Sequence, residues 1–387
     1  MPESPIRKLV PYAEKAKKNG VKVFHLNIGQ PDIETPYSAI EAVKNSNIKV
    51  LAYSKSEGDF ELRNKICDYY SKINIEINES QVIVTSGASE ALLFTIGSIM
   101  DPGDEIIIPE PFYANYNGFS VANGVNIIPI FSSIDNNFKL PKIQEFENLI
   151  SSNTKAILIC NPNNPTGYVY SYDEIKTLVE IVKKHNLFLI ADEVYREFTY
   201  DNVSHTSIMQ FDDIKQHAIV IDSVSKRYSM CGARIGCIIS KNSEFISTAM
   251  KFAQARLSPP TLAQIASTAA MDTGEDYFDK VINEYDNRRK TLLEGLNKIP
   301  GVKVSEPKGA FYCVVELPVD NSEHFAKWLL EEYSLDNETI MVAPAAGFYS
   351  TPNIGQNQVR IAYVLNQNDL ESCINILKNG LMEYLKP

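Results

Sequence analysis

Residues 218–236, AIVIDSVSKRYSMCGARIG, place a lysine, Lys226, shortly after the apolar run of residues 218–221. The run predicts a buried strand, so the Lys226 amine emerges at the carboxyl end of a strand, where open α/β sheets bind ligands. A free lysine has a pKa of about 10.4, but a nearby cation or desolvation lowers that pKa and permits a Schiff base. Most lysines after strands are solvated surface residues. This segment alone therefore does not decide whether Lys226 is a catalytic lysine or a surface lysine.

Short apolar runs recur along the chain and alternate with helical patterns. Seven of them are predicted to be strands, at residues 81–85, 105–109, 126–130, 155–160, 187–191, 218–222 and 236–239. Residues 172–185 have a helical pattern, and Ser171 and Glu174 have the spacing of a capping box. Repeated alternation of strand and helix is typical of an α/β fold, so we expect a large domain with a mostly parallel, seven-stranded sheet covered by helices.

The pattern changes after about residue 288, where strands and helices no longer alternate regularly. This mixture predicts a smaller α+β domain, formed by the N-terminal segment and the C-terminal part of the chain. We expect residues 1–45 to form an N-terminal arm and part of the small domain, residues 46–288 the large ligand-binding domain, and residues 289–387 the small C-terminal domain.

The composition of the 387-residue chain is that of an ordinary globular protein, with 22% charged and 44% hydrophobic residues. Its net charge of −11 argues against nucleic acid or an anionic membrane as a main partner. The first residues lack the apolar core of a signal peptide, and no apolar run reaches the length of about 18 residues that spans a membrane, so we expect a cytoplasmic protein. The six cysteines and five histidines are dispersed, which predicts free thiols and no protein-ligated metal.

Residues 86–90, SGASE, form a glycine-containing turn between a predicted strand and an apolar helix. Such a turn exposes the first helical amides, which bind anions because they lack intrahelical partners and lie at the positive end of the helix dipole. The alternative is an ordinary helix N-cap at Ser86 or Ser89. The turn by itself does not separate an anion site from a simple cap.

Polar residues also follow two other predicted strands. Asn164 lies in NPNNPTG, residues 161–167, where two prolines and a glycine restrict the turn, either to hold the asparagine towards a ligand or for rigidity alone. Asp192 ends a strongly apolar strand, where a carboxylate is unfavourable unless it meets a cation or several donors. A buried structural ion pair produces the same pattern as a functional aspartate.

Together these strand-end residues match the needs of one ligand. Lys226 offers an amine for an aldehyde, and Asp192 offers a counter-ion for a protonated ring nitrogen. Residues 86–89 offer an anion-binding turn for a phosphate, and Arg234 offers a second contact to the same phosphate. Pyridoxal phosphate requires this set. Arg360, in a predicted strand, adds a guanidinium that can form bidentate hydrogen bonds to a carboxylate.

From about residue 26 to residue 363 the chain resembles the fold-type-I pyridoxal-phosphate enzymes of the class I/II aminotransferase family, and most of all bacterial aspartate aminotransferases. The motifs that carry the resemblance are Ser-x-Ser-Lys followed by Gly-x-Arg-x-Gly, Asn-Pro-Thr-Gly, Asp-Glu-x-Tyr and the arginine strand near the C-terminus. The resemblance implies pyridoxal 5'-phosphate as cofactor and transfer of an amino group from an amino acid, with aspartate as the best guess, to a 2-oxo acid such as 2-oxoglutarate. It also implies a ping-pong mechanism through aldimine and quinonoid intermediates.

The resemblance further implies roles for individual residues. Lys226 carries the cofactor and then moves a proton, while Asp192 keeps the ring nitrogen protonated. Tyr195 and Asn164 bind the phenolic oxygen of the cofactor, and Tyr113 stacks on its ring. The expected phosphate contacts come from Gly87, Ala88, Ser89, Ser223 and Arg234, and the expected substrate contacts come from Arg360, Asn164 and Gly29.

Tyr53 resembles the tyrosine that reaches the phosphate from a neighbouring subunit, which implies a homodimer with shared active sites.

Two departures from the family pattern concern specificity. Ala233 stands where relatives often carry a large aromatic residue, and Ser89 stands where some aspartate-specific relatives have lysine. Our hypothesis is that Arg256, from the same chain or from a partner subunit, meets the second carboxylate of the substrate; the alternative is a surface arginine.

The sequence is also compatible with other reactions of the same family of folds. The same scaffold and cofactor serve aminotransferases of aromatic or alanine specificity, β-elimination lyases and cyclopropane-forming synthases, because fold and cofactor do not determine the reaction. A non-enzymatic regulator is disfavoured, because no DNA-binding extension fits in the 387 residues and the catalytic set is complete.

Overall fold

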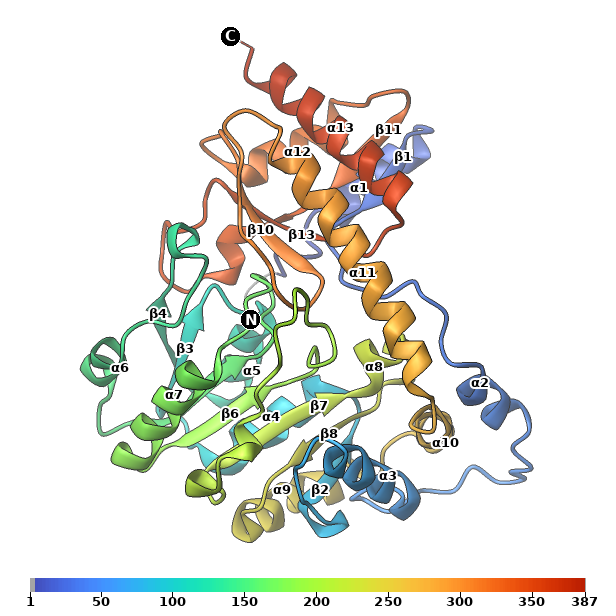
Figure 1. Ribbon diagram of the computed structural model, residues 1–387, viewed down its shortest axis with the longest axis vertical. Helices are drawn as coiled ribbons and strands as arrows, with labels where there is room; N and C mark the ends of the chain where they lie inside the picture. The colour runs from blue at the N-terminus through green and yellow to red at the C-terminus, as the bar shows by residue number, and fades with distance from the viewer. Residues whose placement is uncertain (1–3, 387) are drawn as a thin grey trace.

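A computed structural model describes residues 4–386 and contains three sheets, of which the largest has seven strands in the order β2-β8-β7-β6-β5-β3-β4 (Figure 1). Its strands are β2 (Val82–Thr85), β3 (Glu105–Glu110), β4 (Asn126–Phe131), β5 (Thr154–Cys160), β6 (Phe188–Asp192), β7 (Ala218–Ser223) and β8 (Gly236–Ile239). Only β8 runs antiparallel to its neighbours, β2 and β7. The predicted mostly parallel sheet of seven strands is confirmed.

Helices cover both faces of this sheet because its strands are apolar on both sides. In β7, Ile219 and Ile221 belong to the apolar cluster that includes α4 and α9, whereas Val220 belongs to the cluster that includes α3, α7 and α10. The helices of this part are α2 (Tyr37–Lys44), α3 (Phe60–Ser71), α4 (Ala88–Ile99), α5 (Asn115–Asn123), α6 (Ile143–Leu149), α7 (Tyr172–His185), α8 (Val224–Arg227), α9 (Ser243–Arg256) and α10 (Thr261–Ala270). The capping box predicted for α7 is present, because Ser171 N donates to Glu174 Oε2 at 2.8 Å and Glu174 N donates to Ser171 Oγ at 3.3 Å.

The N-terminal segment and the C-terminal part of the chain form a second, smaller α+β unit. Its antiparallel sheet has the order β12-β13-β10-β9, and β1 pairs in parallel with β11. Its elements are α1 (Val10–Lys18), β1 (Lys22–His25), β9 (Lys303–Val304), β10 (Tyr312–Glu316), α12 (Ser322–Glu331), β11 (Glu338–Met341), β12 (Ala343–Pro344), β13 (Gln358–Ala362) and α13 (Gln367–Tyr384). The long helix α11 (Glu275–Leu296) runs past both units in Figure 1. The predicted boundary at residue 288 falls inside α11, so the domain boundaries stay a prediction.

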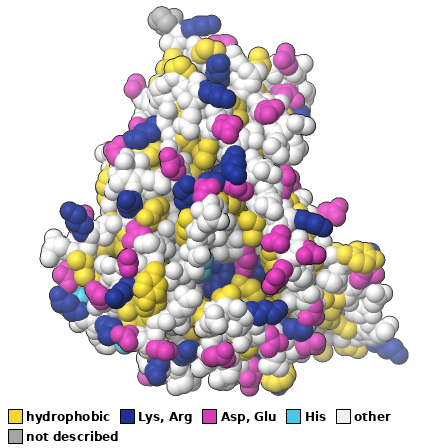
Figure 2. All heavy atoms as spheres, viewed as in Figure 1, with side chains coloured by type: hydrophobic (Ala, Val, Ile, Leu, Met, Phe, Trp, Pro, Cys, Tyr) yellow, Lys and Arg dark blue, Asp and Glu magenta, His cyan; other side chains and the backbone are white. Residues whose placement is uncertain are grey.

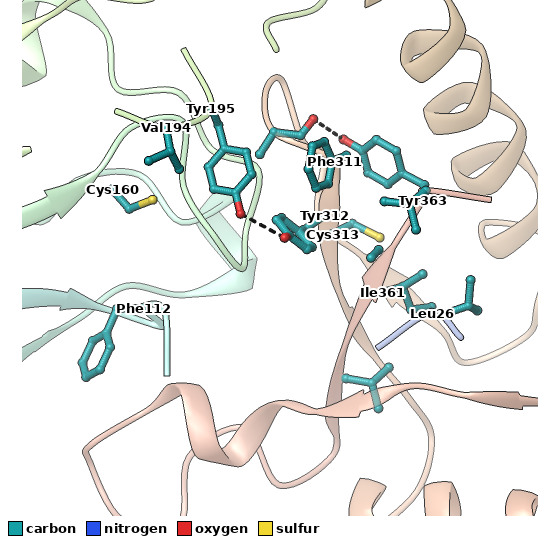
Figure 3. Packing of buried hydrophobic residues seen from close by; sticks show 14 of the residues in the cluster. Leu26, Phe112, Cys160, Val194, Tyr195, Phe311, Tyr312, Cys313, Ile361 and Tyr363 are labelled. Atoms are coloured by element: carbon teal, nitrogen blue, oxygen red, sulfur yellow. Dashed lines mark hydrogen bonds between the residues drawn. The ribbon is translucent and has the colours of Figure 1, made fainter. Parts of the chain in front are cut away.

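One apolar cluster continues from the large sheet into the smaller unit. It contains Ile221 of β7, Tyr195 after β6 and Tyr312 of β10, and Figure 3 shows Tyr195 and Tyr312 facing each other. This packing holds the small sheet against the segments that follow β5 and β6. On the molecular surface, acidic and basic side chains are interspersed over the face seen in Figure 2. None of the helices formed by residues 4–386 is both long and apolar enough to span a membrane.

Candidate active site

The carboxyl ends of three parallel strands meet at one edge of the large sheet. Cys160 of β5 lies beside Asp192 of β6, and Asp192 lies beside Ile221 of β7. The segments that follow these strands border a cavity of about 740 Å³, to which β10 and β13 of the small sheet also contribute. Most of the residues predicted for the site line this cavity, namely Gly29, Ala88, Ser89, Tyr113, Asn164, Asp192, Tyr195, Ser223, Lys226, Arg234 and Arg360.

Lys226 lines the cavity and belongs to the short helix α8. Ser223 ends β7 and caps α8, since its Oγ accepts from Ser225 N at 3.0 Å, and the same hydroxyl donates to Ile235 O at 2.7 Å. Lys226 Nζ donates to Gly29 O at 2.7 Å and lies 5.9 Å from the centre of the Tyr195 ring. The amine therefore has aromatic surroundings and a contact to the N-terminal segment of the chain.

A buried ion-pair network fixes the turn that carries Lys226. Arg227 Nη2 donates to both carboxylate oxygens of Asp222, at 2.9 and 2.7 Å, and its Nε donates to Glu197 Oε1 at 2.7 Å. Burial raises the pKa of Asp222, but the guanidinium of Arg227 outweighs burial and holds that pKa below its ordinary value. Sequence inspection missed this network, although an aspartate at the end of an apolar strand and an arginine five residues later were visible signs of it.

Asp192 is the last residue of β6 and is only 4% exposed. Its Oδ2 accepts from the Tyr116 hydroxyl at 2.9 Å, whereas its buried Oδ1 has no hydrogen-bond partner within residues 4–386. Burial raises the pKa of Asp192 to about 6. A buried carboxylate oxygen without a donor is unfavourable, so the site suits a ligand that brings a cationic N–H group to this oxygen.

Arg360 projects from β13 and is 1% exposed. Its Nη1 donates to Asn164 Oδ1 at 2.9 Å, and its Nη2 donates to the carbonyl oxygen of Asn27 at 2.5 Å. Its guanidinium carbon also lies 4.5 Å from the centre of the Tyr312 ring. These partners are neutral, and burial lowers the pKa of Arg360, so a buried cation at the cavity wall suits an anionic ligand.

The turn before α4 has the geometry of an anion site. Gly87 is the N-cap of α4 with φ +78°, and a Cβ at this position would lie 2.2 Å from Arg234 Nη2. Gly236 packs equally closely, since a Cβ there would lie 2.6 Å from Ala88 N. No side chain caps α4, so the alternative of a simple serine cap at Ser86 or Ser89 is wrong. The free helical amides and the Arg234 guanidinium therefore lie at the same end of the cavity.

Aromatic side chains border the middle of the cavity. The Tyr113 hydroxyl accepts from Asn115 Nδ2 at 2.7 Å, and burial raises the pKa of Tyr113 to about 12. The hydroxyls of Tyr195 and Tyr312 are 2.9 Å apart (Figure 3). Tyr312 was not predicted for the site, because a tyrosine in a buried strand resembles ordinary core. Its proximity explains the glycine at position 29, where a Cβ would lie 1.7 Å from the Tyr312 hydroxyl oxygen.

Three predicted site residues are not among those that line the cavity of their own chain, namely Gly87, which is the N-cap of the adjoining α4, Tyr53 and Arg256. Tyr53 is 79% exposed and lies in the segment between α2 and α3. Arg256 is not the surface arginine of the alternative interpretation. Its Nη1 donates to Glu90 Oε2 at 2.8 Å, and its Nη2 donates to Ser56 O at 3.0 Å. Since Glu90 Oε2 also accepts from Ser86 N at 2.8 Å, Arg256 braces the turn before α4. A substrate contact of Arg256 is not made within this chain and stays a prediction for a neighbouring subunit.

Comparison with known proteins finds one family and several similar structures. A sequence model of the family described as aminotransferase class I and II matches residues 21–377. The chain is 32% identical to the aspartate aminotransferase of Pyrococcus horikoshii over 384 residues, which cover 98% of this chain and 94% of that protein. Among solved structures it resembles the aspartate aminotransferase of Thermotoga maritima, with a TM-score of 0.90, 30% identity and 98% of both chains covered. The alanine aminotransferase of Pyrococcus furiosus is similar to the same degree, with a TM-score of 0.90, 29% identity and 98% of both chains covered.

Proposed function

The chain belongs to the class I and II aminotransferase family, a family of pyridoxal-phosphate-dependent enzymes, and from this premise we propose that it transfers the amino group of aspartate to a 2-oxo acid such as 2-oxoglutarate. Amino transfer is the activity of the family, whereas the choice of aspartate is the proposal. One cavity that contains the Lys226 amine, the Asp192 oxygen without a donor in residues 4–386 and the Arg360 guanidinium supports amino transfer, and the similarity to aspartate aminotransferases supports the choice of aspartate.

The residues of the cavity fit pyridoxal phosphate. Asp192 Oδ1 has no donor among residues 4–386, and the protonated ring nitrogen of the cofactor would supply one. The close approach of Gly87 to Arg234 leaves the helical amides of α4 and the guanidinium open to a phosphate. In this proposal Lys226 holds the cofactor through its amine, Tyr195 and Asn164 hold its phenolic oxygen, and Tyr113 packs on its ring. The proposed phosphate ligands are Gly87, Ala88, Ser89, Ser223 and Arg234.

When bound, the cofactor withdraws electrons from the carbon that bears the migrating amino group. Lys226, whose amine would be free once the substrate amine has replaced it, would act as the base that moves a proton from the substrate Cα to the adjoining carbon of the cofactor. Arg360 and Asn164 orient the substrate through its α-carboxylate, with the Gly29 backbone beside them. The cationic ring nitrogen favours the charged form of Asp192, so the ion pair persists at neutral pH.

We also propose that the enzyme is a homodimer with shared active sites. Several large apolar side chains near Tyr53 in the sequence, from α2 to the start of α3, are exposed, and exposed apolar side chains of this kind are typical of a subunit interface. The exposed residues are Tyr37, Val50, Leu51, Tyr53 and Phe60. In this arrangement Tyr53 reaches the phosphate in the neighbouring subunit.

A second candidate is an aminotransferase of alanine or aromatic specificity. Two features favour it, namely the similarity to the alanine aminotransferase of Pyrococcus furiosus and the serine at position 89, where some aspartate-specific relatives have lysine. Such an enzyme uses the same Lys226 and Arg360 and differs only in the contacts to the substrate side chain.

A panel of amino acids tests both proposals. Purified enzyme with bound cofactor is mixed separately with aspartate, glutamate, alanine and tyrosine, and the absorbance of the cofactor is followed. We expect aspartate to convert the cofactor to its amine form fastest, and 2-oxoglutarate to restore the starting spectrum. Faster conversion by alanine or tyrosine favours the second candidate. Release of pyruvate and ammonia without an acceptor identifies a lyase and overturns both.

A further inference from the structure

Residues 4–9 near the N-terminus form part of the cavity wall. The side-chain amide of Asn27 donates to Ile6 O at 2.8 Å, and the carbonyl of the same Asn27 accepts from Arg360. Pro5 packs closely on Gly347, where a Cβ would lie 2.5 Å from the Pro5 Cβ. Lys8 forms an ion pair with Glu323. The contacts of Ile6 and Pro5 hold the segment in place beside the predicted α-carboxylate site, whereas the partly exposed Lys8–Glu323 pair contributes little.

The held segment presents one charged side chain to the cavity. Arg7 lines the cavity and is exposed there, whereas the neighbouring Lys8 is directed to Glu323. The charge of Arg7 also acts on the Tyr113 phenol, where it opposes the effect of burial on the pKa. Arg7 and Tyr113 line the same cavity as Lys226 and Arg360.

The charges around the cavity leave Arg7 without an assigned ligand. The cationic residues that line it are Arg7, Lys226, Arg234 and Arg360, and Asp192 is its one acidic residue within residues 4–386. In the proposed function Lys226 and Arg234 hold the cofactor and Arg360 holds the α-carboxylate. A dicarboxylic substrate brings one more anionic group than these residues account for. Arg256, which the sequence suggests for the second carboxylate of the substrate, donates a hydrogen bond to Glu90 and does not line the cavity.

We propose that Arg7 binds the second carboxylate of dicarboxylic substrates, that is, the side-chain carboxylate of aspartate and the distal carboxylate of the 2-oxo acid acceptor. This inference rests on the proposed function and assigns the residue that sets its substrate class. A guanidinium is suited to the role because its planar donors pair with both oxygens of a carboxylate. An arginine in the cavity wall selects substrates by the charge of their side chain.

The test compares three variants of the holoenzyme, Arg7→Gln, Lys8→Gln and Arg256→Gln. Lys8→Gln removes the same charge from the same segment but outside the cavity, and Arg256→Gln represents the competing assignment. The kcat/KM values for aspartate and alanine are measured in the half-reaction. The Kd values of succinate and propionate, a dicarboxylate and a monocarboxylate without an amino group, are measured by calorimetry.

We expect Arg7→Gln to lower kcat/KM for aspartate and to weaken succinate binding by about 10- to 100-fold, as for the loss of a charge-assisted hydrogen bond. Alanine and propionate should change by less than about threefold, and Lys8→Gln should resemble the wild type. Equal losses for aspartate and alanine, or a selective loss in Arg256→Gln but not in Arg7→Gln, would overturn the role of Arg7. If the wild type fails to transaminate any donor, the proposed function fails, and the succinate and propionate constants still decide whether Arg7 selects dicarboxylates.

Discussion

The hydroxyl oxygens of Tyr195 and Tyr312 lie 2.9 Å apart and join the two sheets at the cavity (Figure 3). Tyr195 follows β6 of the large sheet, and Tyr312 belongs to β10 of the small one. The Tyr312 ring also packs against the Arg360 guanidinium at 4.5 Å. Tyr312 thus connects the proposed cofactor contact of Tyr195 with the proposed carboxylate contact of Arg360.

Removal of the Tyr312 hydroxyl should therefore act through Tyr195. We expect Tyr312→Phe to lower kcat by about 2- to 10-fold, the effect of one neutral hydrogen bond, while the ring stays beside Arg360. A double-mutant cycle with Tyr195→Phe measures the coupling, which should make the two effects less than additive. Tyr363→Phe is the matched control, because its hydroxyl donates to Ala310 O at 3.3 Å away from the cavity. Fully additive effects would show that Tyr312 does not position Tyr195.

The raised pKa of Asp192 predicts a pH-dependent stability of the cofactor-free protein. Because burial raises this pKa to about 6, the folded protein holds a proton at pH values where the unfolded chain has released it. The contribution of Asp192 to the free energy of unfolding should decrease as the pH rises from about 4 to about 6 and level off above that range. Asp192→Asn does not titrate, so relative to the wild type it should gain about 1–3 kcal/mol between pH 4 and pH 7.

Urea unfolding of the two cofactor-free proteins at several pH values measures this difference. The same substitution should lower transamination by at least about 100-fold, because a neutral amide stabilises the cationic ring nitrogen poorly. Parallel stability curves for wild type and Asp192→Asn would contradict a raised pKa at this residue.

The close approach of Gly87 to Arg234 predicts that Gly87 is needed for phosphate binding. A second glycine with a similar backbone conformation, Gly103, provides the control. Gly87→Ala introduces a Cβ that would lie 2.2 Å from Arg234 Nη2, at a backbone φ of +78°. We expect it to weaken pyridoxal-phosphate binding by about 10- to 100-fold, since it displaces a charged phosphate contact. Gly103→Ala has a similar φ of +96° with no atom within 4 Å of the new Cβ. It should therefore reproduce the backbone strain without the loss of affinity.

The assignment of Lys226 predicts that covalent attachment and catalysis are lost together. Lys226→Ala should still bind the cofactor noncovalently, because the phosphate contacts remain, but should lose transamination by about 10²- to 10⁴-fold. Absorbance spectra and gel filtration of the bound cofactor measure attachment, and the half-reaction with aspartate measures activity. Lys176→Ala, an exposed lysine on α7, is the control. Substantial turnover by Lys226→Ala would overturn the assignment.

The sequence allowed much of the large sheet to be predicted because the signals are local. Buried parallel strands are continuous apolar runs, and a capping box such as that of Ser171 and Glu174 occupies four consecutive residues. The ends of these strands must also meet at one edge, which brings Asn164, Asp192 and Lys226 to one cavity. The positions of Tyr53 and Arg256 could not be judged in this way, because they depend on contacts outside these repeats.

By itself the sequence determined the family and the cofactor and predicted Lys226, Asp192 and Arg360 as site residues, since residue types in a set order carry that information. Only the tertiary structure decided what surrounds them. It paired Arg256 with Glu90, set Tyr312 against Tyr195 and brought Arg7 into the cavity wall. These relations join residues more than a hundred positions apart or depend on how the small sheet packs on the large one. No local pattern encodes them, because long-range contacts are selected by the summed packing of the whole chain.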